Sequence, residues 1–480
     1  MKPFAPHRRA LRVSVALFLP FLLAACAVQR PPSQVPAPAP VQWHAPLPHH
    51  GNLADLARWW ERQDDPLLVQ LISAAQSVSP DLAQARSRLA QARATQVAAR
   101  SALLPSLDAQ ANASRGTNTQ VGALASTAQL GLQAGWELDL WGGNAAASDA
   151  ARERLAGAGA QWHEARVSVA AEVAQQLTGW RSCTQQLAVA ASDARSRGET
   201  ARLSQASEQA GFTAPATAAL ASASFSDAKV RAERQRMQCE INLKVLVALT
   251  GVDETALRAQ LLAAPPPRAP QALFAIAAVP AQALAQRPDV YAAEREVAAA
   301  SAEVGQARAD RYPRLSLSGS IGNGWLRTGG TSSDSTMWSI GPVALTLPLF
   351  DAGRGAAQVT SAQARYEAAA QLYRAQVRKA VGEVEQALVQ LASTDTRRAD
   401  AEQAAAGYRR SFEATEALWR AGLASLVELE DARRTALAAE TGLVALQQER
   451  MSAWIALYRA VGGGWDGNDD TDAVPTASAD

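Results

Sequence analysis

Two acidic residues in the last quarter of the chain have a spacing that suits ion selection. Glu428 and Asp431 lie six and nine residues after Gly422, and residues three apart share one face of a helix. Arranged around a symmetry axis, such a pair would form two rings of carboxylates, which select cations. The alternative is an ordinary acidic helix face in contact with solvent, and the residues themselves leave both interpretations open.

Cys26 ends an apolar stretch that basic residues precede, the order typical of an export signal. The small residues Ala24 and Ala25 before this cysteine resemble a bacterial lipobox, in which the signal is cut before the cysteine and the cysteine carries the lipid. We therefore expect a signal peptide at 1–25 and lipid attachment at Cys26; the alternative is an ordinary cleavage site with an incidental cysteine. Residue 27 is Ala, not the Asp that retains similar lipoproteins at the inner membrane, so sorting to the outer membrane is implied.

The other two cysteines are placed symmetrically about a glycine. Cys183 lies 28 residues before Gly211 and Cys239 lies 28 residues after it. If Gly211 is the tip of an antiparallel helical hairpin, both cysteines lie at one height on neighbouring helices, which pack about 8–10 Å apart. Because an exported chain meets an oxidising compartment, we predict a Cys183–Cys239 disulfide. The alternative is two buried thiols on different helix faces.

The remaining residues give no indication of catalysis or nucleic-acid binding. Five His and three Cys supply few metal ligands, and the net charge of the 480 residues is +1. Gly462-Gly463-Gly464 does not follow an expected strand, so it reads as a helix stop and not as a phosphate-binding loop. We expect no catalytic residue, no metal and no cofactor. After the signal, no apolar run reaches the ~20 residues of a membrane-spanning helix, so any crossing of a membrane must use strands.

A repeated segment divides most of the chain into two copies of one unit. Pro80–Leu107 aligns without a gap to Pro288–Leu315, and Arg100 matches Arg308 in that alignment. The repeat is too long for a solenoid. We expect this organisation: an anchor and extended proline-rich tether without a core at 26–58, repeats at 59–264 and 283–465, a proline-rich linker at 265–282, and a disordered acidic tail at 466–480.

Proline-free stretches predict very long helices. Residues 143–210 and 354–421 are rich in strong helix formers, and each would extend about 100 Å at 1.5 Å per residue. Each ends near a glycine, after which a shorter helix returns, at 216–250 or 426–461. Helices at 80–104 and 289–312 precede the long ones. Apolar residues in these helices recur in steps of three and four and are mostly Ala, which predicts close side-by-side packing.

Between the helices lie segments with a period of two, which is typical of strands with one apolar and one polar face. We expect four strands, at 106–115, 128–140, 314–322 and 337–349. Loops rich in Gly, Ser, Thr and Asn, at 115–127 and 325–336, would join them. Such segments indicate transmembrane barrel strands; a small soluble sheet packed on the helices is the alternative.

Four strands cannot close a barrel alone, because about eight is the practical minimum. An open sheet edge in lipid would leave backbone groups unpaired. Oligomerisation is therefore required, and a trimer is favoured because the interior of an eight-stranded barrel is filled by side chains. The fold class that we expect is mainly α with a small β part, made of long coiled-coil helices and a twelve-stranded barrel closed by three chains.

At this point the chain resembles the TolC-like outer-membrane factors of tripartite efflux pumps, in particular their lipoprotein (NodT/OprM-type) branch. The motifs that carry the resemblance are Trp59-Trp60, Asp65-Pro66-Leu67, Leu71-Ile72, Asp139-Leu140-Trp141-Gly142, Arg287-Pro288-Asp289, Tyr312-Pro313-Arg314-Leu315, Leu349-Phe350-Asp351-Ala352-Gly353, Gly422-Leu423-Ala424-Ser425, and the run from Leu457 to Trp465. Together they cover nearly the whole mature chain.

The resemblance implies a homotrimeric exit duct without enzymatic activity, embedded in outer-membrane lipid and extending into the periplasm. It implies two partners, a periplasmic adaptor (membrane fusion) protein and an inner-membrane transporter of the RND type. It also implies that Glu428 and Asp431 form the pore constriction. The adaptor would dock on the hairpin tips, which are Gly211, Phe212, Thr213, Gly422, Leu423, Ala424 and Ser425. The competing function is a structural or adhesive outer-membrane coiled-coil lipoprotein without a pore.

Overall fold

The computed structural model describes residues 28–40, 43–45, 60, 65–118, 123–264, 284 and 287–465. The predicted signal peptide, Cys26, linker 265–282 and tail 466–480 lie outside these residues. Contacts divide the chain into two units. Unit 1 comprises 1–37, 87–159 and 291–375, and unit 2 comprises 38–86, 160–290 and 376–480. Each unit is described by itself.

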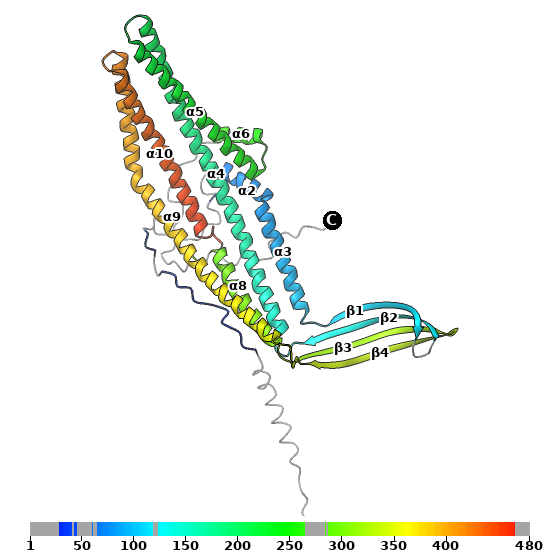
Figure 1. The fold of residues 1–480 in the computed structure, drawn as a ribbon. Coiled ribbons are helices and arrows are strands. Elements are labelled where there is room, and N and C mark those ends of the chain that lie inside the picture. Colours follow the sequence, from blue (N-terminus) through cyan, green and yellow to red (C-terminus); the bar gives the residue numbers. More distant parts are fainter. Residues whose placement is uncertain are drawn as a thin grey trace, which may run out of the picture. The chain divides into compact units, whose positions relative to one another are not determined.

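Long helices form where the absence of proline predicts them (Figure 1). The two longest are α4 (Gly143–Gln209) and α9 (Arg354–Arg420), and the returning helices are α5 (Pro215–Thr250) and α10 (Leu426–Ala460). The helices before the strands are α3 (Pro80–Ser101) and α8 (Pro288–Ala309), and two short helices, α2 (Pro66–Val78) and α6 (Glu254–Ala263), are further elements. None of the described helices is both long and apolar enough to cross a membrane.

Local chemistry explains where the returning helix α5 begins and ends. Pro215 occupies the first turn, where its missing N–H is not needed. Gly251 follows the last turn with φ +65°, and its N–H donates to the carbonyl of Val247. This left-handed conformation favours glycine.

One antiparallel sheet of four strands lies in unit 1, in the order β1-β2-β3-β4 (Figure 1). The strands are β1 (Ser106–Asn118), β2 (Ala123–Leu138), β3 (Arg314–Thr328) and β4 (Thr331–Thr346). Successive strands pair in register along almost their whole length, with a single irregularity between Leu317 and Gly319. The outer edges of β1 and β4 have no partner strand within the described chain.

The expected strands are present, but the loops predicted at 115–127 and 325–336 are wrong. Pairing continues to Asn118↔Ala123 and to Thr328↔Thr331, so the strands extend through most of both segments. Residues such as Gly, Ser and Asn are poor strand formers by composition, but strand propensity depends on cross-strand neighbours more than on residue type. A ladder already in register extends into segments that look like loops.

The described part of the expected proline-rich tether is extended and contacts the helices of unit 1. Residues 28–37, here called the strap, lie against α8 and α9 in unit 1. Proline has no N–H to donate, so the strap presents carbonyl oxygens, and side chains from the helices supply the donors. The hydrogen bonds run from Arg308 to Gln29 (2.7 Å), Ser301 to Pro31 (2.5 Å), Tyr366 to Pro32 (2.9 Å) and Arg374 to Pro36 (3.3 Å).

The main apolar core lies in unit 2, where residues of α2, α4, α5, α6, α9 and α10 pack together. Its fully buried large side chains include Leu71, Leu177, Leu246, Leu388 and Trp454. In unit 1 the buried clusters are small and rich in Ala, as in the contact of Ala150 with Ala299 and Ala302. Small side chains allow helices to approach closely, as the Ala-rich spacing predicts.

A disulfide joins Cys183 of α4 to Cys239 of α5 in unit 2, with 5.5 Å between the Cα atoms. Both cysteines are almost fully buried. The bond lies where the symmetric spacing about Gly211 predicts it, since Gly211 is the turn between the two helices. The crosslink closes a loop of 56 residues.

We expect thiol labelling of the denatured, unreduced protein to find no free thiol at Cys183 or Cys239. Reduction should lower the thermal midpoint of the helical signal, because loop closure of this length contributes on the order of 4 kcal/mol. The C183S/C239S double variant is the control and should melt at the same temperature with and without reductant. Two labelled thiols per unreduced chain would contradict the bond.

Candidate functional site

The two hairpin tips of unit 2 share one backbone structure. At the first tip Gly211 has φ +79°, and Phe212 donates its N–H to the carbonyl of Ser207 at 2.8 Å. At the second tip Gly422 has φ +76°, and Leu423 donates to Leu418 at 2.8 Å. These are Schellman ends, in which the left-handed glycine allows the chain to reverse.

Both tips expose a large apolar side chain directly after the glycine. Phe212 is 86% exposed and Leu423 is 75% exposed. Thr213 hydrogen-bonds to Ser207 at 2.6 Å, whereas Ala424 is half-buried and Ser425 starts α10. Each hairpin therefore ends in an exposed apolar side chain next to a left-handed glycine.

Glu428 takes part in the start of α10. The N–H of Ser425 donates to the Glu428 carboxylate at 2.7 Å, and the Ser425 hydroxyl accepts from the Glu428 N–H at 3.2 Å. This capping box satisfies two free donors at the helix start. The backbone hydrogen bond from Ser425 lowers the pKa of the Glu428 carboxyl, so the group stays charged at neutral pH.

Asp431 lies one turn further along α10 and is exposed, as Glu428 is. Its carboxylate forms an ion pair with Arg434. One chain does not build a ring, so the role of this acidic pair as a constriction stays a prediction. The sequence missed that one member also caps its helix; the signal for it is the Ser-x-x-Glu spacing from Ser425 to Glu428.

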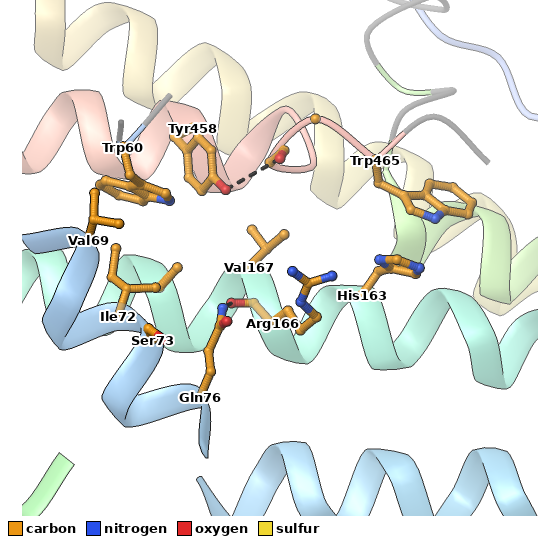
Figure 2. Close-up of a pocket in the computed structure, with 13 residues that line it drawn as sticks. Trp60, Val69, Ile72, Ser73, Gln76, His163, Arg166, Val167, Tyr458 and Trp465 are labelled. Atoms are coloured by element: carbon orange, nitrogen blue, oxygen red, sulfur yellow. Dashed lines mark hydrogen bonds between the residues drawn. The ribbon is translucent and has the colours of Figure 1, made fainter. Parts of the chain in front are cut away.

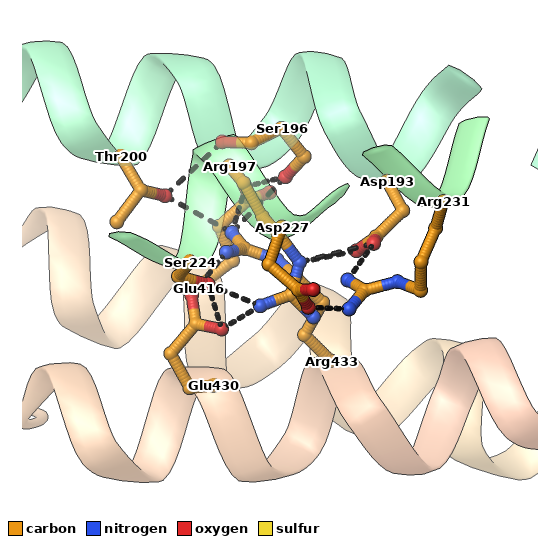
Figure 3. Close-up of polar contacts among 10 residues, drawn as sticks. All are labelled: Asp193, Ser196, Arg197, Thr200, Ser224, Asp227, Arg231, Glu416, Glu430 and Arg433. Carbon is orange, nitrogen blue, oxygen red and sulfur yellow. Dashed lines mark hydrogen bonds and ion pairs between the residues drawn. The ribbon is translucent and has the colours of Figure 1, made fainter. Parts of the chain in front are cut away.

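A buried ionic network connects the two hairpins near their tips, and sequence reasoning did not find it (Figure 3). Arg197 of α4 binds the carboxylate of Asp193 at 2.9 Å and also pairs with Glu430 of α10. Arg433 of α10 donates to Glu430 at 2.6 Å and to Thr200 of α4 at 3.0 Å. Glu430 thus lies between two guanidinium groups.

The two arginines of the network are almost fully buried. The side chain of Arg433 is 3% exposed and that of Arg197 is 8% exposed. Burial lowers the pKa of Arg433, and its guanidinium carbon lies 5.4 Å from the centre of the Phe412 ring. Apolar residues of both hairpins, among them Ala201 and Leu429, pack beside it. A buried charge cluster of this kind is destabilised strongly when one partner is removed.

Spacing is the signal that could have revealed the network. Besides Ser182, the buried polar residues of α4 are Asp193, Arg197, Thr200 and Ser204, the last four in steps of four, three and four. This is the same seam spacing that marks the Ala-rich contacts. A polar residue at a seam position is therefore the clue to a buried network.

A pocket of about 240 Å³ lies between α2, α4 and the end of α10 in unit 2 (Figure 2). Trp60 packs edge-on against Tyr458, with 4.7 Å between ring centres, and Gln76 of α2 donates to the carbonyl of Arg166 at 3.2 Å. The Tyr458 hydroxyl donates to the carbonyl of Gly463 at 3.3 Å. These contacts join Trp60 to the end of α10 and α2 to α4.

The motifs Arg287-Pro288-Asp289 and Asp351-Ala352-Gly353 also have structural roles. Arg287 is buried and donates to Asp289 at 2.9 Å, to Glu383 at 2.8 Å and to the carbonyl of Ala460 at 2.7 Å. Burial raises the pKa of Asp289, but the hydrogen bonds and the charge of Arg287 oppose this effect, and the pKa is lowered overall. Asp351 accepts from the N–H of Gly355 at 2.7 Å and so caps α9. Across all residues that the structure describes, no group of three His, Cys, Asp or Glu could hold a metal.

The sheet has one polar and one apolar face, as the alternation of its residues predicts. On the polar face Gln110 bonds to Gln133 at 2.7 Å, and Ser320 bonds to Ser339 at 2.9 Å. The apolar face exposes large side chains that include Leu130, Leu132, Trp136, Ile321 and Trp325. A sheet that exposes a wide apolar face requires a cover of lipid or protein.

Known proteins match the chain over most of its length. A family model described as outer membrane efflux protein matches residues 71–252 and 279–463. The pyoverdine export outer membrane protein OpmQ of Pseudomonas putida is 30% identical over 469 residues, covering 94% of this chain and 97% of the relative. Outer membrane protein OprJ of Pseudomonas aeruginosa is 30% identical over 467 residues, covering 94% and 95%. The solved outer-membrane channel OprN superposes with a TM-score of 0.78 at 27% identity, covering 92% and 97%.

The ionic network generates a prediction about how firmly the hairpins hold together. We expect E430Q to leave two buried guanidinium groups without their shared carboxylate and to destabilise the contact by about 3 kcal/mol. Amide hydrogen exchange around Arg197 and Arg433 should then become about a hundredfold faster. The matched control is E413Q, which removes a carboxylate of α9 that is exposed. Equal exchange rates in E430Q and the unchanged protein would show that the network does not stabilise the contact between the hairpins.

Proposed function

The chain belongs to the outer membrane efflux protein family and is an efflux exit duct of the outer membrane, and we propose that it does this work as a homotrimer within a tripartite pump. The resemblance stated from the motifs is thereby confirmed. The partners proposed are a periplasmic adaptor and an inner-membrane transporter of the RND type. Transport through the duct is passive in this proposal, with the energy supplied by the inner-membrane transporter.

The observation that carries the trimer is the open sheet. The edges of β1 and β4 expose unpaired backbone groups along 13 and 16 residues, and such edges are not tolerated in lipid. Because each chain supplies four strands, three copies supply twelve, which leave a lumen. The polar face would then line the lumen, and the apolar face would meet lipid.

The hairpins give the duct its periplasmic end. Each chain supplies two of them, α4 with α5 and α9 with α10, so three chains would supply a ring of six. We place the adaptor on the tips because Phe212 and Leu423 are exposed apolar side chains there. Glu428 and Asp431 lie in the first turns after the second tip, where a threefold axis would bring them together as carboxylate rings.

The strap supports lipid anchoring at Cys26. Its first hydrogen bond, from Arg308 to the carbonyl of Gln29, fixes the chain three residues after Cys26, a reach of about 10 Å in extended chain. Arg308 lies near the end of α8, shortly before β3 begins at Arg314. Acyl chains on Cys26 would therefore enter the membrane beside the base of the strands.

We expect mass spectrometry of the mature amino terminus to find an acylated Cys26 and no residues before it. The C26S variant should keep the signal and run as a heavier, unacylated precursor, because processing follows lipid transfer to the cysteine. The same measurement on C183S, which keeps Cys26, is the control. A mature protein that starts at another residue would contradict lipid attachment.

The duct itself is tested by conductance. We expect the purified trimer to conduct in planar bilayers with a preference for cations, and E428Q/D431N to shift the reversal potential toward zero and to raise the conductance. D400N/E413Q removes two other exposed carboxylates and should leave selectivity unchanged. Unchanged selectivity in E428Q/D431N would show that Glu428 and Asp431 belong to an ordinary helix face in contact with solvent. Absence of any conductance would favour the structural lipoprotein without a pore.

A further inference from the structure

The described strands hold only six charged residues, and all of them lie toward strand ends. Three are at the end that joins the helices and three are at the end that carries the turns. Those at the helix end are Asp108, Glu137 and Arg314, and those at the turn end are Arg115, Arg327 and Asp334. Charge placed only outside the middle of the strands fits a sheet whose middle lies in hydrocarbon.

Arg115 and Arg327 share one row of the sheet. Arg115 of β1 is opposite Ser126 of β2, and Ser126 is opposite Arg327 of β3. Directly opposite residues point to the same face, so both arginines are on one face with a single strand between them. At about 4.8 Å per strand, their Cα atoms are about 10 Å apart.

That face is the apolar one. Trp325 lies two residues before Arg327 on the same strand and therefore on the same face. Ser114, next to Arg115, points the other way, where it bonds to Thr127 at 2.7 Å on the polar face. The two arginines are thus outside the polar lumen face and adjacent to an exposed tryptophan.

The position along the strand coincides with the edge of the hydrocarbon. From Leu315 to Trp325 the apolar face of β3 spans eleven residues, and the ten steps between them are about 34 Å of strand and about 26 Å of membrane depth at a 40° tilt. The apolar band of such barrels is about 25 Å tall. Arg327 is the next residue on this face, so it emerges where headgroups begin.

Chain connectivity decides which leaflet this is. α3 and α8 lead into β1 and β3, and α4 and α9 follow β2 and β4, so all four helices join one end of the sheet. The last pairs of the two hairpins of strands, Asn118↔Ala123 and Thr328↔Thr331, are at the opposite end. With the helices in the periplasm, the arginine row meets the outer leaflet, whose main lipid is the phosphorylated glycolipid lipopolysaccharide.

We propose that Arg115 and Arg327 form a binding site for the phosphate groups of lipopolysaccharide on the lipid-facing side of the duct. Guanidinium groups match phosphate oxygens in bidentate geometry. Neither arginine has an ion pair within the described part of the chain. Asp334, opposite Trp325 and diagonal to Arg327, is the carboxylate that would oppose an anionic ligand. The site rests on the proposed barrel for its exposure to lipid, its depth and its leaflet.

Native mass spectrometry of the detergent-solubilised protein with diphosphoryl lipid A tests the site. We expect R115Q/R327Q to bind at least about tenfold more weakly, since a charge-assisted contact accounts for roughly that factor. D334N should bind more tightly, because it removes the opposing charge. The control is R314Q, which changes an arginine of the same strand at its other end and on the other face, and it should bind as the unchanged protein does.

Three results would overturn the proposal: equal affinity of R115Q/R327Q and the unchanged protein, an equal loss in R314Q, or binding of phosphatidylglycerol as tight as that of diphosphoryl lipid A. Conductance of R115Q/R327Q in planar bilayers is measured in parallel. Normal conductance shows that the variant has folded and assembled. A failure of lipid A binding in a conducting protein overturns this site while leaving the duct intact.

Discussion

The unpaired edges of the sheet are the constraint on which the rest of the molecule depends. Each edge strand leaves N–H and C=O groups that neither lipid nor another described strand satisfies. Closing the sheet with further copies, as proposed, would also bring together the helices of those copies, because every strand continues directly into a helix or follows one. Satisfying backbone hydrogen bonds in the membrane therefore also builds the periplasmic part of the duct. The duplicated unit fits this logic, since each repeat supplies one strand pair and one hairpin.

Much of this arrangement could be predicted because the residues that end its helices act locally. The long helices end where glycine takes a left-handed conformation, at Gly211 and Gly422, and these residues are visible in the sequence. The disulfide followed from the same symmetry, since two cysteines equidistant from a tip lie at one height. Family membership followed from motifs such as Arg287-Pro288-Asp289, which the structure shows to be a buried junction.

The features that could not be predicted depend on partners distant in the sequence. β1 extends through Arg115 and Gly116 because β2 pairs with them, not because those residues favour strands. The strap is held by donors that lie 270 or more residues away, as in the contact of Ser301 with Pro31. The network around Glu430 joins residues that are separated by more than 200 positions. The composition of a segment carries no information about such contacts.

The buried network and the thin Ala seams have complementary consequences. A seam of similar small side chains specifies helix register weakly, because a shift by one turn replaces Ala with Ala. Arg197 and Arg433 have partners that exist at only one height, so a shifted hairpin would bury unpaired charge. We infer that the network contributes specificity of alignment more than net stability, as polar groups buried in helical interfaces do in several systems.

The strap has a consequence for the order of events in biogenesis. Residues 28–37 are synthesised before residues 301–374, which form their binding surface on α8 and α9. Contacts of such long sequence separation form late in folding. The strap therefore cannot complete its contacts with α8 and α9 until Arg374 has been synthesised.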